Sequence, residues 1–201
     1  MAKQRLAIVR GERIVNQTAK GNPSYTRLKG LMNYIAYGRY QDQPAFALTP
    51  RPAQAEATTA SAPEVWSRGL WLDHNGKAVS HEDALRWARD KIHRYGYEYS
   101  YQLLLSTRYG GLTPADFNQV LRQSSDLSDT REWRLMLHDD TGNQHAHAIL
   151  LRRERLSNAL YKAWQQALQA GLERRQAERQ QEQELEMQRA PKWAQEQETT
   201  L

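Results

Sequence analysis

Three of the six histidines of this 201-residue chain lie in one ten-residue segment, together with two carboxylates. The segment reads His138-Asp139-Asp140-Thr141-Gly142-Asn143-Gln144-His145-Ala146-His147. Its flanks are apolar enough for strands, and Asp-Asp-Thr-Gly-Asn has turn chemistry, so the pattern predicts an antiparallel hairpin. His145 and His147 are two residues apart and would leave one face of a strand, about 7 Å apart. If residue 138 pairs with residue 145, all three imidazoles share that face.

Three neutral imidazoles on one wall leave coordination positions open, as in a catalytic metal site. Asp140 could orient one of these histidines or accept a proton. Asn143 could belong to the site as part of this spacing, or it could be only a turn residue. A His-x-His pair alone is more often structural, but the full spacing favours a metal site. Mn²⁺ or Mg²⁺ is the ion we expect first, with Zn²⁺, Co²⁺ and Ni²⁺ as alternatives that suit nitrogen ligands.

The same segment resembles motif III of the HUH-type conjugative relaxases of the MOBP class, which nick single-stranded DNA at a plasmid or integrative-element transfer origin. Asn33-Tyr34-Ile35-Ala36 is similar to motif I, where the nucleophilic tyrosine lies. Tyr101-Gln102-Leu103-Leu104-Leu105-Ser106-Thr107, followed by Leu112-Thr113-Pro114-Ala115-Asp116, resembles motif II, a strand that ends in a serine before a helix. The resemblance covers about residues 25 to 152. Motif III is its most specific part and motif I its least specific.

The resemblance implies a tyrosine transesterase. Tyr34 would attack the phosphodiester, become linked to the 5′ phosphate and free a 3′ hydroxyl, and the retained ester energy would allow resealing without ATP. A tyrosine hydroxyl has a pKa of about 10 and needs a base or a metal to become a good nucleophile. A divalent ion on His138, His145 and His147 would bind the scissile phosphate and offset the developing charge. Accessory relaxosome proteins and a coupling protein are further partners that the resemblance implies.

Several residues have competing interpretations. Tyr37 lies three residues after Tyr34 on the same helical face, and Tyr40 follows, so either could be the nucleophile, or the stripe could simply pack on the sheet. Ser106 could bind a DNA phosphate, as in motif II, or cap backbone at the strand end. We assign no ligand role to the remaining histidines, which are His74, His81 and His93.

The composition fits a cytoplasmic DNA-binding protein. The chain has no cysteine, its start lacks the apolar core of a signal peptide, and no stretch approaches the roughly 18 apolar residues of a membrane span. The net charge is +5, and residues 1–50 carry eight basic against two acidic side chains. Such a concentration predicts salt-sensitive binding to a nucleic acid. Arg27, Lys29 and Arg39 are the DNA contacts we expect from this stretch.

The order of elements predicts an α+β fold, an antiparallel sheet covered by helices, in agreement with the HUH fold that the resemblance implies. We expect strands near 6–15, 66–79, 99–107 and in the histidine hairpin, and helices near 24–39, 81–95 and after Thr113. Ser80 and Thr113 are the caps we expect at the starts of the last two helices. Residues 1–156 would form the nuclease-like domain, with a flexible loop at 41–64. Residues 157–201 would form a helical, Gln-, Glu- and Arg-rich extension whose early part packs on the sheet.

Three functions remain open from sequence alone. The first is an active relaxase that nicks single-stranded DNA. The second is another HUH nuclease, such as a replication initiator or a transposase, although in those the metal motif precedes the tyrosine, whereas here Tyr34 precedes His145. The third is a DNA-binding protein or regulator that keeps the fold but does not nick.

Overall fold

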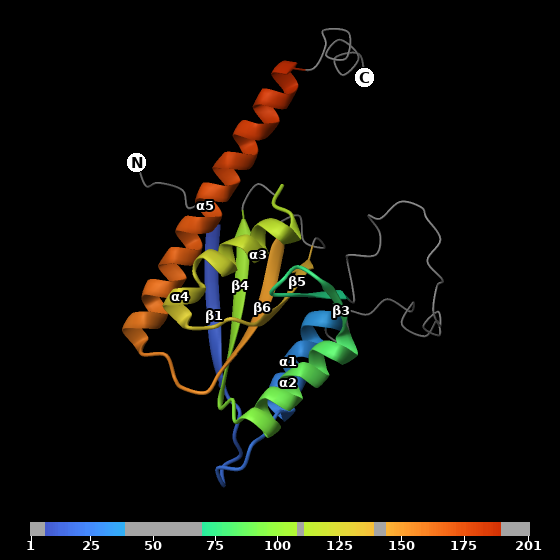
Figure 1. The fold of residues 1–201 in the computed structure, drawn as a ribbon, viewed down its shortest axis with the longest axis vertical. Coiled ribbons are helices and arrows are strands. Elements are labelled where there is room, and N and C mark those ends of the chain that lie inside the picture. The colour runs from blue at the N-terminus through green and yellow to red at the C-terminus, as the bar shows by residue number, and fades with distance from the viewer. Residues whose placement is uncertain (1–6, 39–69, 108–110, 139–143, 190–201) are drawn as a thin grey trace, which may run out of the picture.

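The computed structural model of the protein describes residues 7–38, 70–107, 111–138 and 144–189. It is α+β, with a six-stranded antiparallel sheet in the order β1-β4-β6-β5-β2-β3 (Figure 1). The strands are β1 (Ala7–Val15), β2 (Leu70–Asp73), β3 (Ala78–Ser80), β4 (Tyr99–Thr107), β5 (Trp133–His138) and β6 (His145–Arg152). The helices are α1 (Thr26–Tyr37), α2 (His81–Tyr95), α3 (Pro114–Gln123), α4 (Ser125–Ser128) and α5 (Asn158–Arg189). The α+β class and the antiparallel sheet are therefore as predicted, while the predicted loop at 41–64 lies outside the described residues.

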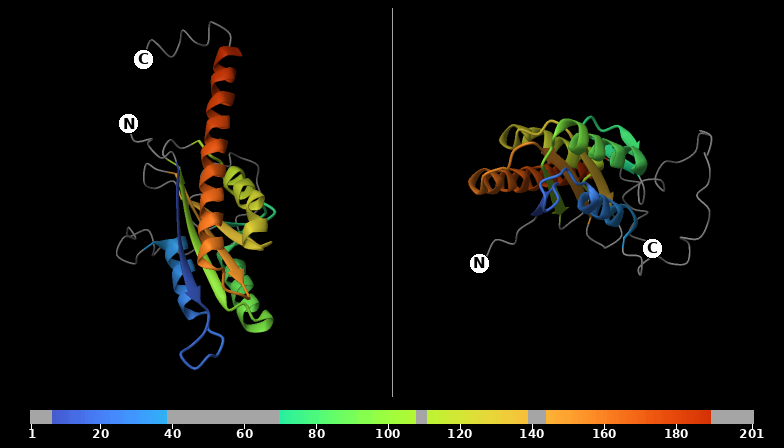
Figure 2. Two further views of the ribbon diagram at one scale, coloured as in Figure 1. Left: turned by 90° about the vertical axis from the view of Figure 1, so that its left-hand side faces the viewer. Right: turned by 90° about the horizontal axis from the view of Figure 1, so that it is seen from below.

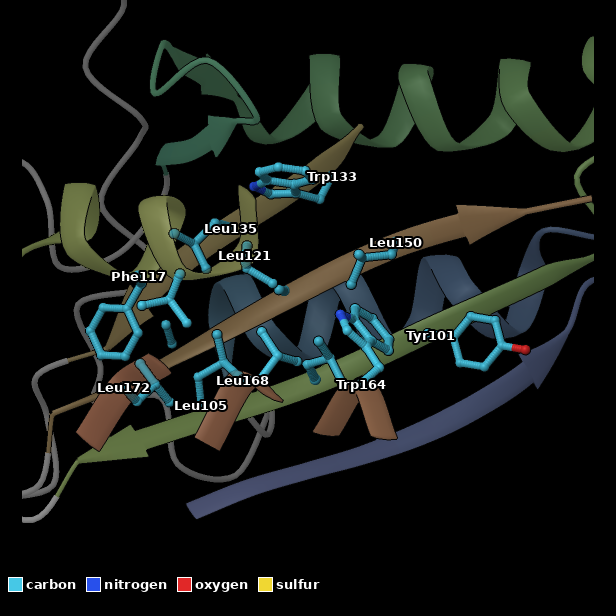
Figure 3. Packing of buried hydrophobic residues seen from close by; sticks show 14 of the residues in the cluster. Tyr101, Leu105, Phe117, Leu121, Trp133, Leu135, Leu150, Trp164, Leu168 and Leu172 are labelled. Atoms are coloured by element: carbon cyan, nitrogen blue, oxygen red, sulfur yellow. The ribbon is translucent and has the colours of Figure 1, made fainter. Parts of the chain in front are cut away.

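One face of the sheet packs against α3 and α5. Alternate residues of the central strands, among them Leu105, Leu135 and Leu150, meet Phe117 of α3 in a buried cluster (Figure 3). Helix α5 closes this cluster with Trp164, Leu168 and Leu172, which lie four residues apart and therefore on one side of the helix. In Figure 3 the segments of α5 cross in front of the sheet, and α1 lies behind it.

The opposite face is covered by α1 and α2. Their apolar stripes, which include Met32 and Ile35 of α1 and Ala88 of α2, pack with Met136 of β5 and Ile149 of β6. Strand β6 is buried on both faces because its apolar residues alternate between these two clusters. The central strand therefore has little freedom to slide or turn over.

Local capping chemistry sets the helix starts as the sequence predicted. The Ser80 side chain accepts from Asp83 N–H at the start of α2. Thr113 and Asp116 form a reciprocal capping box at the start of α3, with Pro114 in its first turn. The short helix α4 was not predicted.

Helix α5 continues well past Gly171, where the sequence becomes rich in Arg, Gln and Glu. Gly171 is buried against α3, where an added Cβ would lie 2.9 Å from Val120 Cγ1. Leu160, which precedes Trp164 by four residues, is 37% exposed and lies outside the buried cluster. Figures 1 and 2 show the last turns of α5 extending beyond the sheet. Within the described ranges, no helix combines the length and apolar character that membrane crossing requires.

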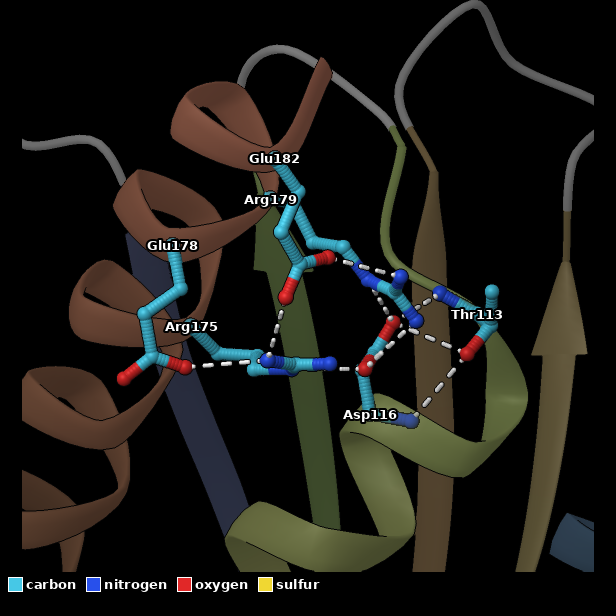
Figure 4. Close-up of polar contacts among 6 residues, drawn as sticks. All are labelled: Thr113, Asp116, Arg175, Glu178, Arg179 and Glu182. Carbon is cyan, nitrogen blue, oxygen red and sulfur yellow. Dashed lines mark hydrogen bonds and ion pairs between the residues drawn. The ribbon is translucent and has the colours of Figure 1, made fainter. Parts of the chain in front are cut away.

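A buried carboxylate joins α5 to α3. Asp116 is 2% exposed and accepts from Arg175 Nε at 2.7 Å and from Arg179 Nε at 3.1 Å (Figure 4). Its Oδ2 also accepts from the Thr113 backbone N–H at 2.7 Å. Burial alone raises the pKa of Asp116, but the hydrogen bonds from Thr113, Arg175 and Arg179 outweigh burial and lower this pKa to about 2. The carboxylate thus fixes the middle of α5 against α3.

We expect Asp116→Asn to lower the free energy of unfolding by about 2 kcal/mol at neutral pH, because the ionised form is favoured in the folded state. The folded-state pKa of about 2 lies below the ordinary value of 3.8, so this stabilisation is present above pH 4 and disappears as the pH falls toward 2. Urea unfolding at pH 7 and pH 3 measures it, with the exposed Asp126→Asn as control. A difference between wild type and Asp116→Asn that does not shrink at pH 3 would contradict this assignment.

Candidate metal centre

The three histidines of the 138–147 segment lie together at one end of the sheet. His138 pairs directly with His145, as the sequence analysis required for a shared face. His147 pairs with Met136 on one side and with Leu104 on the other. Because directly opposed residues project to the same side, all three imidazoles leave the face that carries Met136 and Ile149, which is the face of α1 and α2.

The geometry of the cluster fits a divalent ion. One ring nitrogen from each histidine lies within 4.8 Å of the other two, and the ring centroids are 4.9–5.4 Å apart. An ion about 2.1 Å from three nitrogens holds them about 3.4 Å apart, so small side-chain rotations would bring the donors into place. His147 is buried, while His138 and His145 are half-buried. An ion held here would therefore keep its remaining coordination positions toward solvent at the end of the strands.

Gln102 holds the buried histidine from β4. Its Nε2 lies 3.1 Å from Nδ1 of His147, which is a diagonal contact between neighbouring strands. An amide exchanges its oxygen and nitrogen by a half-turn, so Oε1 can take the same position and accept from Nδ1–H. That arrangement leaves Nε2 of His147 unprotonated for a metal. Gln102 was part of the motif II segment, but nothing in the sequence identified its contact with His147.

The sheet order adds two more side chains to this face. Ser106 pairs with His145, so its side chain lies on the same side as the imidazoles. On the edge strand, Arg10 pairs with Leu104, the neighbour of His147, and Arg10 is exposed. Arg10 therefore offers a cation on the histidine face. Sequence analysis missed this residue because only the pairing of β1 with β4 places it there.

The other predicted DNA contacts are less close to the histidines. Arg27 and Lys29 are exposed near the start of α1, and Arg27 is bonded to Glu12 at 3.2 Å. Ile8 of β1 pairs with Ser106 and therefore marks the histidine end of the sheet. Glu12 lies four residues further along β1, which corresponds to about 13 Å from Ile8. The structure thus does not bring Arg27, with its partner Glu12, to the three histidines. Arg39, Asp140 and Asn143 lie outside the described residues.

The candidate nucleophiles lie in the last turns of α1, where Tyr34 is 47% and Tyr37 is 52% exposed. Helix α1 starts beside the end of β1, where Ser24 N–H bonds Asn16 O. It ends beside α2, where Asn33 meets His81. Tyr40 lies outside the described residues.

Comparison of the chain with family models, curated proteins and solved structures gives no match. What is established is an α+β protein with three histidines that could hold a metal ion.

Replacing Gln102 with Leu should weaken binding of Co²⁺ about 10- to 100-fold, because His147 would lose the group that fixes its ring and tautomer. Gln102→Glu should preserve or strengthen binding, since a carboxylate accepts the same Nδ1–H. Visible absorbance during a Co²⁺ titration provides the measurement. Gln119→Leu, on the exposed side of α3, is the matched control. Equal affinities for the wild type and the Gln102→Leu variant would contradict the role of Gln102.

Proposed function

We propose that this protein is a metal-dependent single-strand DNA endonuclease of the relaxase type, which nicks a transfer origin through a 5′-phosphotyrosyl intermediate. The observation that carries the proposal is the convergence of His138, His145 and His147 on one sheet face, in a segment that resembles relaxase motif III. A catalytic metal needs open positions, and this cluster is half-buried at a strand end.

Side chains suited to phosphate lie on the same face. Ser106, across from His145, can donate its hydroxyl to a phosphate oxygen. Arg10 can pair with the backbone of a single strand that approaches over β1 and β4. These positions support a DNA path that crosses the histidine end of the sheet.

Helix geometry supports Tyr34 over Tyr37 as the nucleophile. Successive residues of a helix are turned by about 100°, so Tyr34 is turned about 100° from Asn33 and lies on the exposed side of α1, away from the buried stripe. Asn33 faces α2, where it contacts His81, and the ring of Tyr37 meets the same imidazole edge-on at 5.0 Å. Tyr34 is therefore turned out of this contact with His81 and is exposed.

The proposed step is a transesterification. The Tyr34 oxygen bonds to phosphorus, the bond from phosphorus to the 3′ oxygen breaks, and the hydroxyl proton is taken up by a base while the 3′ oxygen gains one. A divalent ion on the three histidines would polarise the phosphate and offset its developing charge. Ser106 and Arg10 would bind and orient the strand, and Gln102 would keep His147 in its metal-binding tautomer.

Tyr34→Phe should abolish a covalent protein–DNA adduct while sparing most of the DNA affinity, because only the attacking oxygen is removed. A denaturing gel with labelled single strands from the genetic neighbourhood and Mn²⁺ measures the adduct, with Tyr37→Phe as the matched variant that should retain it.

An adduct that persists in Tyr34→Phe and disappears in Tyr37→Phe would move the nucleophile to Tyr37. DNA and metal binding without any adduct in the wild type would instead indicate a non-nicking DNA-binding protein. Adducts with replication-origin or transposon-end strands only would indicate one of the other HUH nucleases.

Arg10→Ala should weaken single-stranded DNA binding uniformly across sequences and reduce the slope of log affinity against log salt by about 0.7, the value for one lost phosphate contact. Arg13→Ala is the matched control, because Arg13 lies on the same strand but projects to the opposite face. Fluorescence anisotropy over a range of salt concentrations gives both slopes. Equal slopes for the two variants would exclude a DNA path over the histidine face of β1.

A further inference from the structure

Three elements that are remote in the sequence meet at the imidazole of His81. This residue opens α2 and is 7% exposed. Its Nδ1 lies 3.0 Å from Nε1 of Trp71 on β2, and its Nε2 lies 2.9 Å from Oδ1 of Asn33 on α1. Trp71 is fully buried, so the anchor on β2 is rigidly held.

The direction of both hydrogen bonds follows from donor chemistry. An indole N–H can only donate, so Nδ1 of His81 accepts from Trp71. The ring proton is then on Nε2, which donates to the side-chain oxygen of Asn33. Each ring nitrogen thus has a partner of the complementary kind, and the two hydrogen bonds fix the ring plane. The side chains therefore form a continuous hydrogen-bonded connection from the sheet through α2 to α1.

This connection lies close to the metal-binding strand. Leu72 of β2 pairs with Leu135 of β5, so the preceding residue, Trp71, is level with Met136. Met136 in turn pairs with His147 of β6. Trp71 is on β2 and His147 on β6, two strands apart, or about 10 Å. The contact of His81 with α1 therefore acts at the end of the helix that is nearest to the histidines.

The connection also sets the rotation of α1. Asn33 immediately precedes Tyr34, and Tyr37 follows Asn33 by one helical turn on the α2 side. Both Asn33 and Tyr37 contact His81. A rotation of α1 by one residue, about 100°, would bring Tyr34 to α2 in place of Asn33 and lose the bond to His81.

We propose that His81 is the positioning residue of the nucleophile helix: by bonding both Trp71 and Asn33, it fixes the rotation of α1 that presents Tyr34 and turns Tyr37 toward α2. The inference rests on the proposed nicking function. His81 acts through Asn33 and has no part in the bonds that form or break.

The test compares variants that remove the connection with variants that keep it. His81→Leu loses both hydrogen bonds of the connection and Asn33→Leu loses the one to α1, whereas Asn33→Asp retains an oxygen in the position that accepts from Nε2–H. His93→Leu makes the same chemical change as His81→Leu on the exposed side of α2. If His81→Leu fails to fold, the comparison of Asn33→Leu with Asn33→Asp still tests the proposal.

Two readouts are needed. In protein labelled with 3-fluorotyrosine, the fluorine signals of Tyr34 and Tyr37 should shift or split in His81→Leu and Asn33→Leu, and should keep their wild-type positions in Asn33→Asp and His93→Leu. Single-turnover nicking should slow about a hundredfold in the first two variants, the scale expected for a misplaced reactive group, with unchanged DNA affinity.

Unchanged fluorine signals in His81→Leu and Asn33→Leu would overturn the proposal. Slowing that is equal in Asn33→Leu and Asn33→Asp would also overturn it, because it would reflect a general loss of stability. A wild-type protein that forms no adduct would refute the nicking function, while the fluorine signals would still decide whether His81 fixes α1.

Discussion

The register of β6 between β4 and β5 is the constraint on which the candidate site depends. Side chains alternate along a strand, so a shift of one residue would turn His145 and His147 to the other face. The neighbours prevent such a shift, because Ala148 and Leu150 fill the cluster under α5 while Ile149 fills the cluster under α1. Burial of each large side chain contributes about 1.5–3 kcal/mol, so apolar packing on both faces holds the imidazoles in place.

The two helical layers have different tasks. On one face, α3 and α5 form an apolar core that is fastened by the ion pairs of Asp116 with Arg175 and Arg179. On the other face, α1 and α2 cover the middle of the sheet and leave His138, His145 and Ser106 half-buried at its end. The first layer supplies stability. The second brings the tyrosine helix beside the candidate metal centre.

The sequence predicted the features that depend on local chemistry. Apolar runs flanking turn residues predicted the hairpin, and the caps at Ser80 and Thr113 predicted the starts of two helices. The pairing of His138 with His145, which the sequence analysis could state only as a condition, is present in the structure. Features that depend on strand order were missed. Arg10 reaches the histidine face only because β1 pairs with β4. The hydrogen bonds of His81, which the sequence analysis left without a role, join residues 33, 71 and 81 across three elements. The partners of Asp116 are about sixty residues away in α5, and no local pattern identifies such pairs.

The central claim is that His138, His145 and His147 bind one divalent ion together. Anomalous diffraction from crystals grown with Mn²⁺ tests it most directly. We predict a single strong peak about 2.2 Å from one ring nitrogen of each of the three histidines, with its remaining positions open toward solvent. A peak that involves only one of these histidines, or none, would contradict the account, because the three rings would then be together for a structural reason alone.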